Sequence, residues 1–420
     1  MISIIIGIII ILGIAVLITS CSLTYPTPSG KYKVGTTLLE FEDSSRTEWA
    51  EPEKNQNRKF VVRMWYPAKP TGEETRLPIM EKPYSEGMSK LYGFPGGSEE
   101  PSQSYQNAQI LQTETPYPIL IFTHGGGSFA TQNLTSMEEL ASQGFLVISM
   151  SFPYESVATI FPDSTVVEMK DLEEFKKNME NIAEDKEFNT KFAANTEALK
   201  NPNPQKAKEA SIELGKDYLK LYPQIKTWLD TRIIDLSYLI NSLDEISIQN
   251  FKLTEIADKN NIGLFGHSLG ALTTLKFLME KELPAIKCGI SLDVPYFNFD
   301  SESSISLNTP VLFMSSDKIK IGDSEVRLSG TNDFLAHYTE KQLHECTVKE
   351  SAHYNFTDMN YVSPLLKFTP LLGSISQKEA AKILTHYLNA YFKHHLQGES
   401  INKLYENISE EVVFREITWK

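Results

Sequence analysis

Residues 261–278 read NIGLFGHSLGALTTLKFL, and this stretch decides the fold of the chain. The apolar run at 261–265 is typical of a buried strand, and residues 271–278 follow a helical pattern. Between them, GHSLG at 266–270 places a serine in a sharp turn from strand to helix. Flanking glycines permit the close packing that such a turn needs. We therefore predict that Ser268 is a nucleophile.

Short apolar runs recur on both sides of this turn, and helical stretches separate them. Such runs are typical of parallel strands that are covered by helices on both faces. The sequence thus predicts an α/β-hydrolase fold, with a mostly parallel central sheet flanked by helices. The strands are expected at 118–122, 145–150, 262–265, 286–292, 310–314 and 344–349. Residues 36–41 and 60–66 alternate as edge or half-exposed strands do, and residues 68–117, rich in Pro, Gly and Ser, are predicted to be loops.

A serine hydroxyl needs a base, and this fold places a histidine on a loop after the last strand. His353 follows the predicted last strand at 344–349, so we predict His353 as the base. His267, inside the turn, is expected to be structural. Two acids could orient the histidine, because Asp293 and Asp317 both end predicted strands and both fit the order serine, acid, histidine. The commoner position in this fold slightly favours Asp317.

Two backbone amides must stabilise the tetrahedral oxyanion. One is expected from Leu269, directly after the nucleophile. The other is expected after the strand at 118–122, where HGGG occupies residues 124–127, and we assign it to Gly126.

Composition excludes several classes of function. A formal net charge of −14 argues against nucleic-acid binding and against adsorption to anionic membranes by charge alone. Three cysteines do not make a disulfide framework, and the eight histidines show no metal spacing. No metal or organic cofactor is therefore expected, and the oligomeric state stays open.

The N-terminus is predicted to lie outside the catalytic fold. Residues 2–18 are almost wholly apolar, and ITSC at 18–21 resembles a bacterial lipobox in which Cys21 is acylated. An uncleaved anchor helix or an ordinary signal peptide are the alternatives, because no Lys or Arg precedes the apolar run. All three place the protein outside the cytoplasm, and the first two attach it to a membrane. We therefore divide the chain into a signal or anchor at 1–21 and one hydrolase domain at 22–420.

A helical insertion interrupts this domain at about 164–220. It is dense in charged residues, with apolar residues at helical spacing and a break at 201–204. It is either a solvated surface excursion or a cap over the site.

Several segments of the chain match a known family, and they are residues 26–37, 64–68, 122–129, Arg232 with Asp235, 288–293 and 353–356. These segments resemble the plasma-type platelet-activating factor acetylhydrolases, also called lipoprotein-associated phospholipases A2, and their bacterial relatives. The resemblance implies Asp293 as the acid and calcium-independent hydrolysis of short or oxidised sn-2 acyl esters of phospholipids. Gly126 departs from some relatives, which carry a bulky residue there.

Two other functions remain in view. A general short-chain carboxylesterase or polyester hydrolase would act on small esters with the same fold and residues. A catalytically silent, membrane-tethered binding protein is the alternative from another class. A silent scaffold has no need of Ser268, Asp293, His353 and the glycine loop together, which argues against it.

Overall fold

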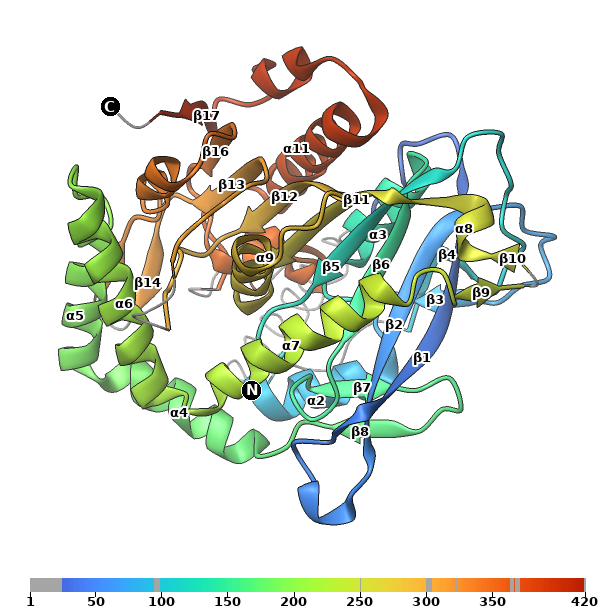
Figure 1. The fold of residues 1–420 in the computed structure, drawn as a ribbon, viewed down its shortest axis with the longest axis horizontal. Coiled ribbons are helices and arrows are strands. Elements are labelled where there is room, and N and C mark those ends of the chain that lie inside the picture. Colours follow the sequence, from blue (N-terminus) through green and yellow to red (C-terminus); the bar gives the residue numbers. More distant parts are fainter. Residues whose placement is uncertain are drawn as a thin grey trace, which may run out of the picture.

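The computed structural model describes residues 25–93, 99–249, 251–299, 304–321, 324–362, 366 and 371–418. Across these residues an 11-stranded sheet runs in the order β17-β16-β13-β12-β11-β5-β6-β2-β1-β4-β3 (Figure 1). Its central part is parallel, as the apolar runs predicted, and comprises β16 (Leu343–Val348), β13 (Val311–Ser316), β12 (Ile286–Leu292), β11 (Ala257–His267), β5 (Tyr117–Thr123) and β6 (Leu146–Ser151). The α/β-hydrolase fold is thereby confirmed.

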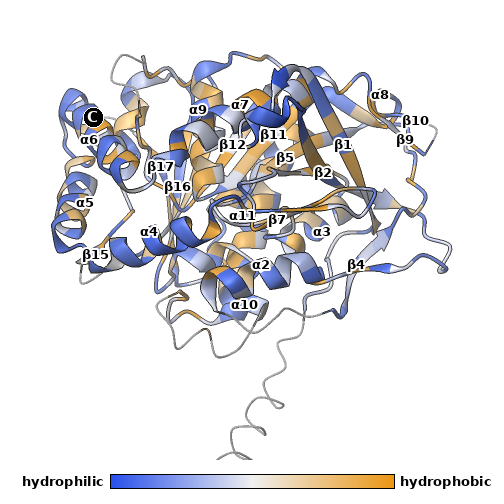
Figure 2. Cartoon of the chain, turned by 90° about the horizontal axis from the view of Figure 1, so that it is seen from below, coloured by the Kyte–Doolittle hydropathy of each residue, from blue (hydrophilic) through white to orange (hydrophobic). Residues whose placement is uncertain are grey.

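Helices cover both faces of the sheet. The helices α7 (Gln224–Asn241) and α9 (Leu269–Glu280) pack on one face, and α3 (Leu134–Ser142) and α11 (Gln377–Gln397) pack on the other. Figure 2 shows hydrophobic residues concentrated in the strands and in the helix faces turned toward them. Burial of these faces drives the layered arrangement and fixes where each strand ends.

Antiparallel strands, β2 and β17, flank the parallel part of the sheet, and two predictions about the outer strands were wrong. Strand β2 (Asn57–Ala68) was expected to be half-exposed, but it lies between β6 and β1 (Lys33–Thr47) and is buried from Phe60 onward. Its polar Arg63 is buried because Glu81 pairs with it at 2.8 Å. Strand β17 (Val412–Ile417) pairs beyond β16, so the strand before His353 is not the last.

The segment at 68–117 is not made of loops alone. It contains β3 (Arg76–Pro78), α2 (Lys82–Tyr92) and β4 (Pro101–Gln106). Strand β4 reads PSQSYQ, so it lacks the apolar alternation by which strands are recognised. Its buried Ser104 hydroxyl donates instead to the Glu138 carboxylate at 2.6 Å.

The predicted insertion contains β8 (Val166–Glu168), which pairs with β7 (Ala158–Ile160), and the helices α4 (Leu172–Glu184), α5 (Lys186–Ala198) and α6 (Pro204–Leu221). These helices form a group at one side of the sheet (Figure 1). Asn203 caps α6 by accepting from two backbone amides, which explains the break before that helix. Shorter elements are η1 (Pro52–Lys54), β9 (Ser247–Ile248), β10 (Phe251–Lys252), α8 (Leu253–Ile256), β14 (Ile319–Ile321), β15 (Ser324–Val326), η2 (Asp333–Tyr338), η3 (His353–Phe356), α10 (Met359–Val362) and η5 (Ile401–Tyr405).

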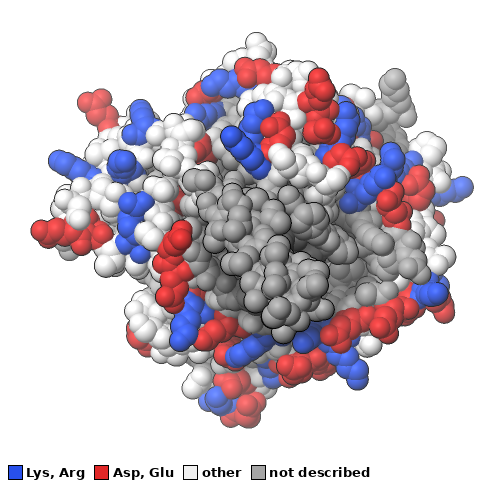
Figure 3. All heavy atoms as spheres, turned by 180° about the vertical axis from the view of Figure 1, so that it is seen from behind, with Lys and Arg blue, Asp and Glu red and all other residues white. Residues whose placement is uncertain are grey.

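Within the described ranges, no helix combines the length and the apolar character needed to cross a membrane. The predicted signal or anchor, including Cys21, lies outside the described residues. On the face seen in Figure 3, Lys and Arg side chains are interspersed with Asp and Glu. The negative net charge is therefore not gathered into a single patch among the described residues of that face.

Candidate active site

Ser268 lies in the turn between β11 and α9, at the carboxyl end of a central strand. Its backbone has φ 55° and ψ −121°, a conformation that costs about 1–3 kcal/mol for a residue with a side chain. The flanking glycines leave no space for a Cβ atom. A Cβ on Gly266 would lie 2.3 Å from the backbone of Gly270, and one on Gly270 would lie 1.9 Å from the Thr123 carbonyl oxygen. This crowding explains why glycines stand on both sides of the serine.

His353 and Asp293 come from loops beside this turn. His353 begins η3 after β16, and Asp293 directly follows β12. The His353 Nδ1 atom lies 2.7 Å from Asp293 Oδ2, and the Asp293 side chain is fully buried. The other carboxylate oxygen accepts the Ser316 N–H at 2.6 Å.

The Asp293 carboxylate stays charged despite its burial. Burial alone would raise the pKa of Asp293, but the hydrogen bond and charge of His353 and the bond from Ser316 hold that pKa below its usual value. Because an ionised carboxylate only accepts hydrogen bonds, the His353 proton lies on Nδ1 and Nε2 is left as an acceptor.

Asp317, the alternative acid, lies one residue beyond β13. Its backbone N–H donates to the Val348 carbonyl oxygen at 3.0 Å, and its side chain forms no hydrogen bond with His353. The end of β13 supports the site through the Ser316 amide instead. In the structure, Asp293 rather than Asp317 contacts the histidine.

Ser268 and His353 line the same two cavities, but no hydrogen bond joins the hydroxyl to the imidazole. Such bonds are often long in free enzymes and shorten in the substrate complex. The His353 side chain is 30% exposed, so its Nε2 face is open to an entering substrate.

His267 packs behind His353, with ring centroids 4.5 Å apart. Its Nε2 atom lies 3.1 Å from the His353 carbonyl oxygen, and its Nδ1 atom lies 3.0 Å from the Gln132 side-chain amide. Burial, together with the charge of His353, lowers the pKa of His267 to about 3, so this imidazole is neutral near pH 7. His267 therefore supports the backbone of the histidine loop, in line with the structural role expected for it.

The glycine-rich segment at 124–127, which is predicted to stabilise the oxyanion and is called the oxyanion loop below, lies against the turn that carries Ser268. A Cβ on Gly126 would lie 3.2 Å from Leu269 Cδ2. The Gly126 N–H donates to no other described residue. Leu269 is the first residue of α9, so its N–H has no partner within the helix, and the helix N-terminus favours negative charge. Two unpaired amides thus lie beside Ser268.

Two cavities of unlike character meet at Ser268. The first, the mixed pocket, has a volume of about 230 Å³ and is lined by Tyr25, Met80, Met88, Phe129, Gln132, Asp358 and Tyr361, among others. The second, the aromatic pocket, has a volume of about 220 Å³ and is lined by Phe175, Met179, Tyr218, Tyr222, Trp228 and Phe297, among others. Helices α4 and α6 of the insertion therefore supply part of the wall of the aromatic pocket.

Comparison with known proteins adds an independent line of argument. Residues 17–412 match the family model described as platelet-activating factor acetylhydrolase, isoform II. The chain belongs to this acetylhydrolase family. The platelet-activating factor acetylhydrolase of Bos taurus is 26% identical over 391 residues, which cover 88% of this chain and 77% of the relative. That of Gallus gallus is 28% identical over 338 residues, which cover 76% of this chain and 73% of the relative.

A solved structure agrees with the fold. A ferulic acid esterase from Streptomyces cinnamoneus superposes with a TM-score of 0.66 at 19% identity, covering 92% of this chain and 98% of the esterase. Family membership, predicted from residues, is confirmed, and the protein is a carboxylic ester hydrolase of the acetylhydrolase family. Within the described ranges, His, Cys, Asp and Glu side chains do not gather in groups of three that would hold a metal ion.

Proposed function

We propose that this acetylhydrolase-family enzyme cleaves short or oxidised sn-2 acyl esters of phospholipids through an acyl-enzyme on Ser268. The observation that carries the proposal is the pair of unlike cavities that meet at the Ser268 side chain. The aromatic pocket suits an apolar acyl group of limited length, and the mixed pocket, whose wall includes Gln132 and Asp358, suits a leaving group that carries polar atoms.

In the first half-reaction, Ser268 Oγ attacks the ester carbonyl carbon while His353 Nε2 takes the hydroxyl proton. Asp293, bonded to His353 Nδ1, stabilises the imidazolium that forms. The carbonyl oxygen becomes an anion that accepts hydrogen bonds from the amides of Gly126 and Leu269. Collapse of this intermediate breaks the bond to the alcohol oxygen, which receives the proton from His353 and leaves as a lysophospholipid.

In the second half-reaction, water attacks the acyl carbon and gives a proton to His353 Nε2. The second tetrahedral intermediate collapses, and His353 returns the proton to Ser268 Oγ. The products are a free carboxylic acid and the regenerated enzyme. None of these steps requires a metal ion or an organic cofactor, so we expect activity to persist in excess chelator.

The aromatic wall of this second pocket supports a preference for short acyl groups. Because Phe175 and Trp228 close part of this cavity with their rings 5.4 Å apart, a long chain requires these rings to move.

We also propose that the N-terminus attaches the enzyme to a membrane, through acylated Cys21 or an anchor helix. Tyr25, the first described residue, lines the mixed pocket. The four residue-to-residue steps from Cys21 to Tyr25 span at most about 14 Å when extended. A tether at Cys21 would therefore hold the Tyr25 side of the pocket near the lipid surface in the extracytoplasmic envelope.

A substrate panel tests the proposed function. We expect the highest specificity constant for phosphatidylcholines with acetyl to hexanoyl sn-2 groups, and at least a tenfold lower value for palmitoyl with the same sn-1 chain. A higher value for palmitoyl than for acetyl would contradict the proposal. Turnover of p-nitrophenyl acetate without turnover of any phospholipid would instead establish the general carboxylesterase.

A further inference from the structure

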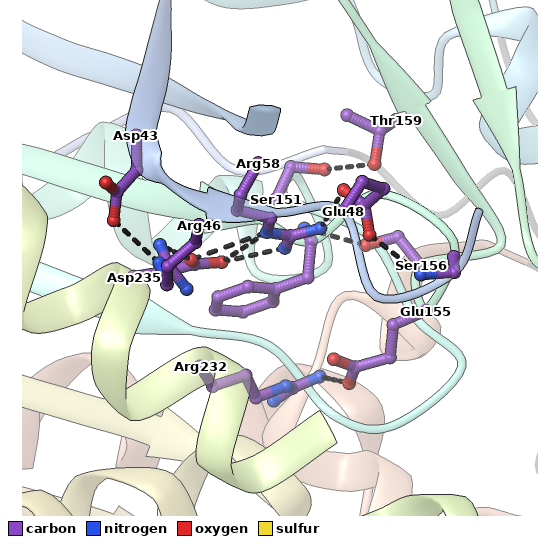
Figure 4. Close-up of polar contacts among 12 residues, drawn as sticks. Asp43, Arg46, Glu48, Arg58, Ser151, Glu155, Ser156, Thr159, Arg232 and Asp235 are labelled. Atoms are coloured by element: carbon purple, nitrogen blue, oxygen red, sulfur yellow. Dashed lines mark hydrogen bonds and ion pairs between the residues drawn. The ribbon is translucent and has the colours of Figure 1, made fainter. Parts of the chain in front are cut away.

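Arg232 is a fully buried guanidinium on α7 that the reaction steps above do not use. Its Nη1 atom donates to the His124 carbonyl oxygen at 2.6 Å, and its Nη2 atom lies 3.3 Å from the Gly125 carbonyl oxygen. The guanidinium thus binds two consecutive carbonyls of the oxyanion loop. It also forms an ion pair with Glu155 (Figure 4). Its Cζ atom lies over the Phe152 ring, 4.5 Å from the ring centroid.

These contacts fix the direction of the oxyanion-loop amides. In a trans peptide the C=O and the following N–H point in opposite directions. Holding the Gly125 carbonyl toward Arg232 therefore turns the Gly126 N–H away from Arg232, and Gly126 itself lies beside Leu269. The His124–Gly125 peptide is also held at both ends, because the His124 carbonyl oxygen accepts from Arg232 and the Gly125 N–H donates to Gln132 at 2.9 Å.

The His124 side chain adds a second donor to the Gly125 carbonyl oxygen. Its Nδ1 atom lies 2.7 Å from the Gly125 oxygen, and its Nε2 atom lies 2.9 Å from the Ser156 hydroxyl. Because a carbonyl oxygen only accepts hydrogen bonds, Nδ1 carries the proton and Nε2 accepts from Ser156. Two donors on the Gly125 carbonyl polarise the Gly125–Gly126 peptide, which strengthens the Gly126 N–H as a donor.

We propose that Arg232 is a positioning residue for the oxyanion hole, holding the Gly125–Gly126 peptide so that its N–H meets the developing oxyanion. This inference rests on the proposed function, since it requires Ser268 to form a tetrahedral intermediate. Arg232 touches no reacting atom and acts through the peptide that it holds. Lysine cannot replace it, because a single ammonium lacks the planar fork that reaches two carbonyls.

The same helix provides a matched control. Asp235, one turn beyond Arg232, is buried and binds Arg58 of β2 and Arg46 of β1, each at 2.7 Å (Figure 4). Arg58 also pairs with Glu48 at 2.9 Å. Like Arg232, Arg58 is a buried, ion-paired guanidinium, but among the described residues its side chain binds Asp235 and Glu48 and not the oxyanion loop.

The experiment compares Arg232→Lys with Arg58→Lys, using p-nitrophenyl acetate and a trifluoromethyl ketone that forms a hemiketal anion on the serine. Loss of an oxyanion donor lowers kcat by about 10²–10³-fold, so misalignment of one donor should lower it by about ten- to a hundredfold. For Arg232→Lys we expect that loss in kcat, a nearly unchanged KM, and a parallel loss of trifluoromethyl ketone affinity. For Arg58→Lys we expect a lower Tm with kcat per folded molecule unchanged.

A double variant separates the positioning of the oxyanion-loop peptide by Arg232 from the neutralisation of the Glu155 charge. Arg232→Met with Glu155→Gln removes both charges together, so it leaves no unpaired buried ion and is expected to fold even if Arg232→Lys does not. The proposal predicts that kcat and ketone affinity fall in this double variant as well. Wild-type kcat in either Arg232 variant, or a loss of kcat with unchanged ketone affinity, would overturn the proposal. Failure of the proposed function would look different, because wild-type enzyme would then leave phospholipids intact or Ser268→Ala would remain active.

Discussion

Replacing Asp293 with asparagine should remove most activity while the fold persists. In the structure, one carboxylate oxygen accepts the Ser316 N–H at 2.6 Å and the other accepts from His353 Nδ1 at 2.7 Å. An asparagine that keeps its oxygen toward Ser316 turns its NH2 group toward His353. The imidazole must then accept at Nδ1 and carry its proton on Nε2, where it can no longer take a proton from Ser268.

The expected loss is large. In a serine protease, the wrong histidine tautomer costs about 10⁴-fold in kcat, which corresponds to about 5 kcal/mol of transition-state stabilisation. The matched variant is Asp317→Asn, at the neighbouring strand end, for which we expect less than a tenfold loss because its side chain forms no hydrogen bond with the histidine. Hydrolysis of p-nitrophenyl acetate near pH 7.5 measures both effects, and circular dichroism checks folding. A folded, inactive Asp317→Asn beside an active Asp293→Asn would refute this reasoning.

Three further predictions concern other parts of the molecule. Phe175→Ala should open the aromatic pocket and raise the palmitoyl-to-acetyl ratio of specificity constants by about tenfold, and an unchanged ratio would remove the pocket from acyl selection. Burial raises the pKa of Asp358 to about 7. The folded protein therefore keeps a proton on Asp358 that the unfolded chain releases above about pH 4. Because the folded state binds more protons, the free energy of unfolding falls as the pH rises from about 4 to 7. Asp358→Asn should make the decline of Tm between pH 4 and pH 7 shallower, and a decline as steep as that of the wild type would contradict this assignment. Cys21→Ala should abolish incorporation of radiolabelled fatty acid, and a wild-type protein that incorporates none would favour the anchor helix.

Sequence rules predicted correctly those parts of the structure that depend mainly on residues close together in the chain. The turn around Ser268 is determined by two glycines without space for a Cβ, and the parallel strands are recognised because both of their faces are buried. Strand β4 was missed because a polar strand, held by side-chain bonds such as that from Ser104 to Glu138, carries no hydrophobic period. Helix α2 does bury residues at helical spacing, Tyr84, Met88 and Leu91, but it lies in a segment whose Pro, Gly and Ser content favoured loops.

The choice between the two acids could not be made from fold rules. Asp293 and Asp317 follow adjacent strands, whose ends lie about 4.8 Å apart at the same edge of the sheet, so both reach the neighbourhood of His353. The resemblance to the acetylhydrolases favoured Asp293, and Asp293 is the residue in contact with the histidine.

Contacts between segments far apart in the chain could not be predicted from the sequence either. The insertion was interpreted as a surface excursion or a cap, and the sequence did not show that its helices α4 and α6 contribute part of the wall of the aromatic pocket. Gln132, which links the Gly125 amide to His267, was not predicted, because a glutamine within a loop carries no signal of its own. These contacts depend on how distant segments pack, which periodicity does not encode.

The central claim is that Ser268 forms the acyl-enzyme of an ester hydrolase. Treatment with a fluorophosphonate, followed by intact-protein and peptide mass spectrometry, tests it most directly. We expect one adduct per chain, located on Ser268, with inactivation proportional to labelling, and for Ser268→Ala neither the adduct nor more than about 10⁻⁴ of wild-type activity. Complete inactivation with Ser268 unmodified, or more than a tenth of the activity retained in Ser268→Ala, would contradict the account.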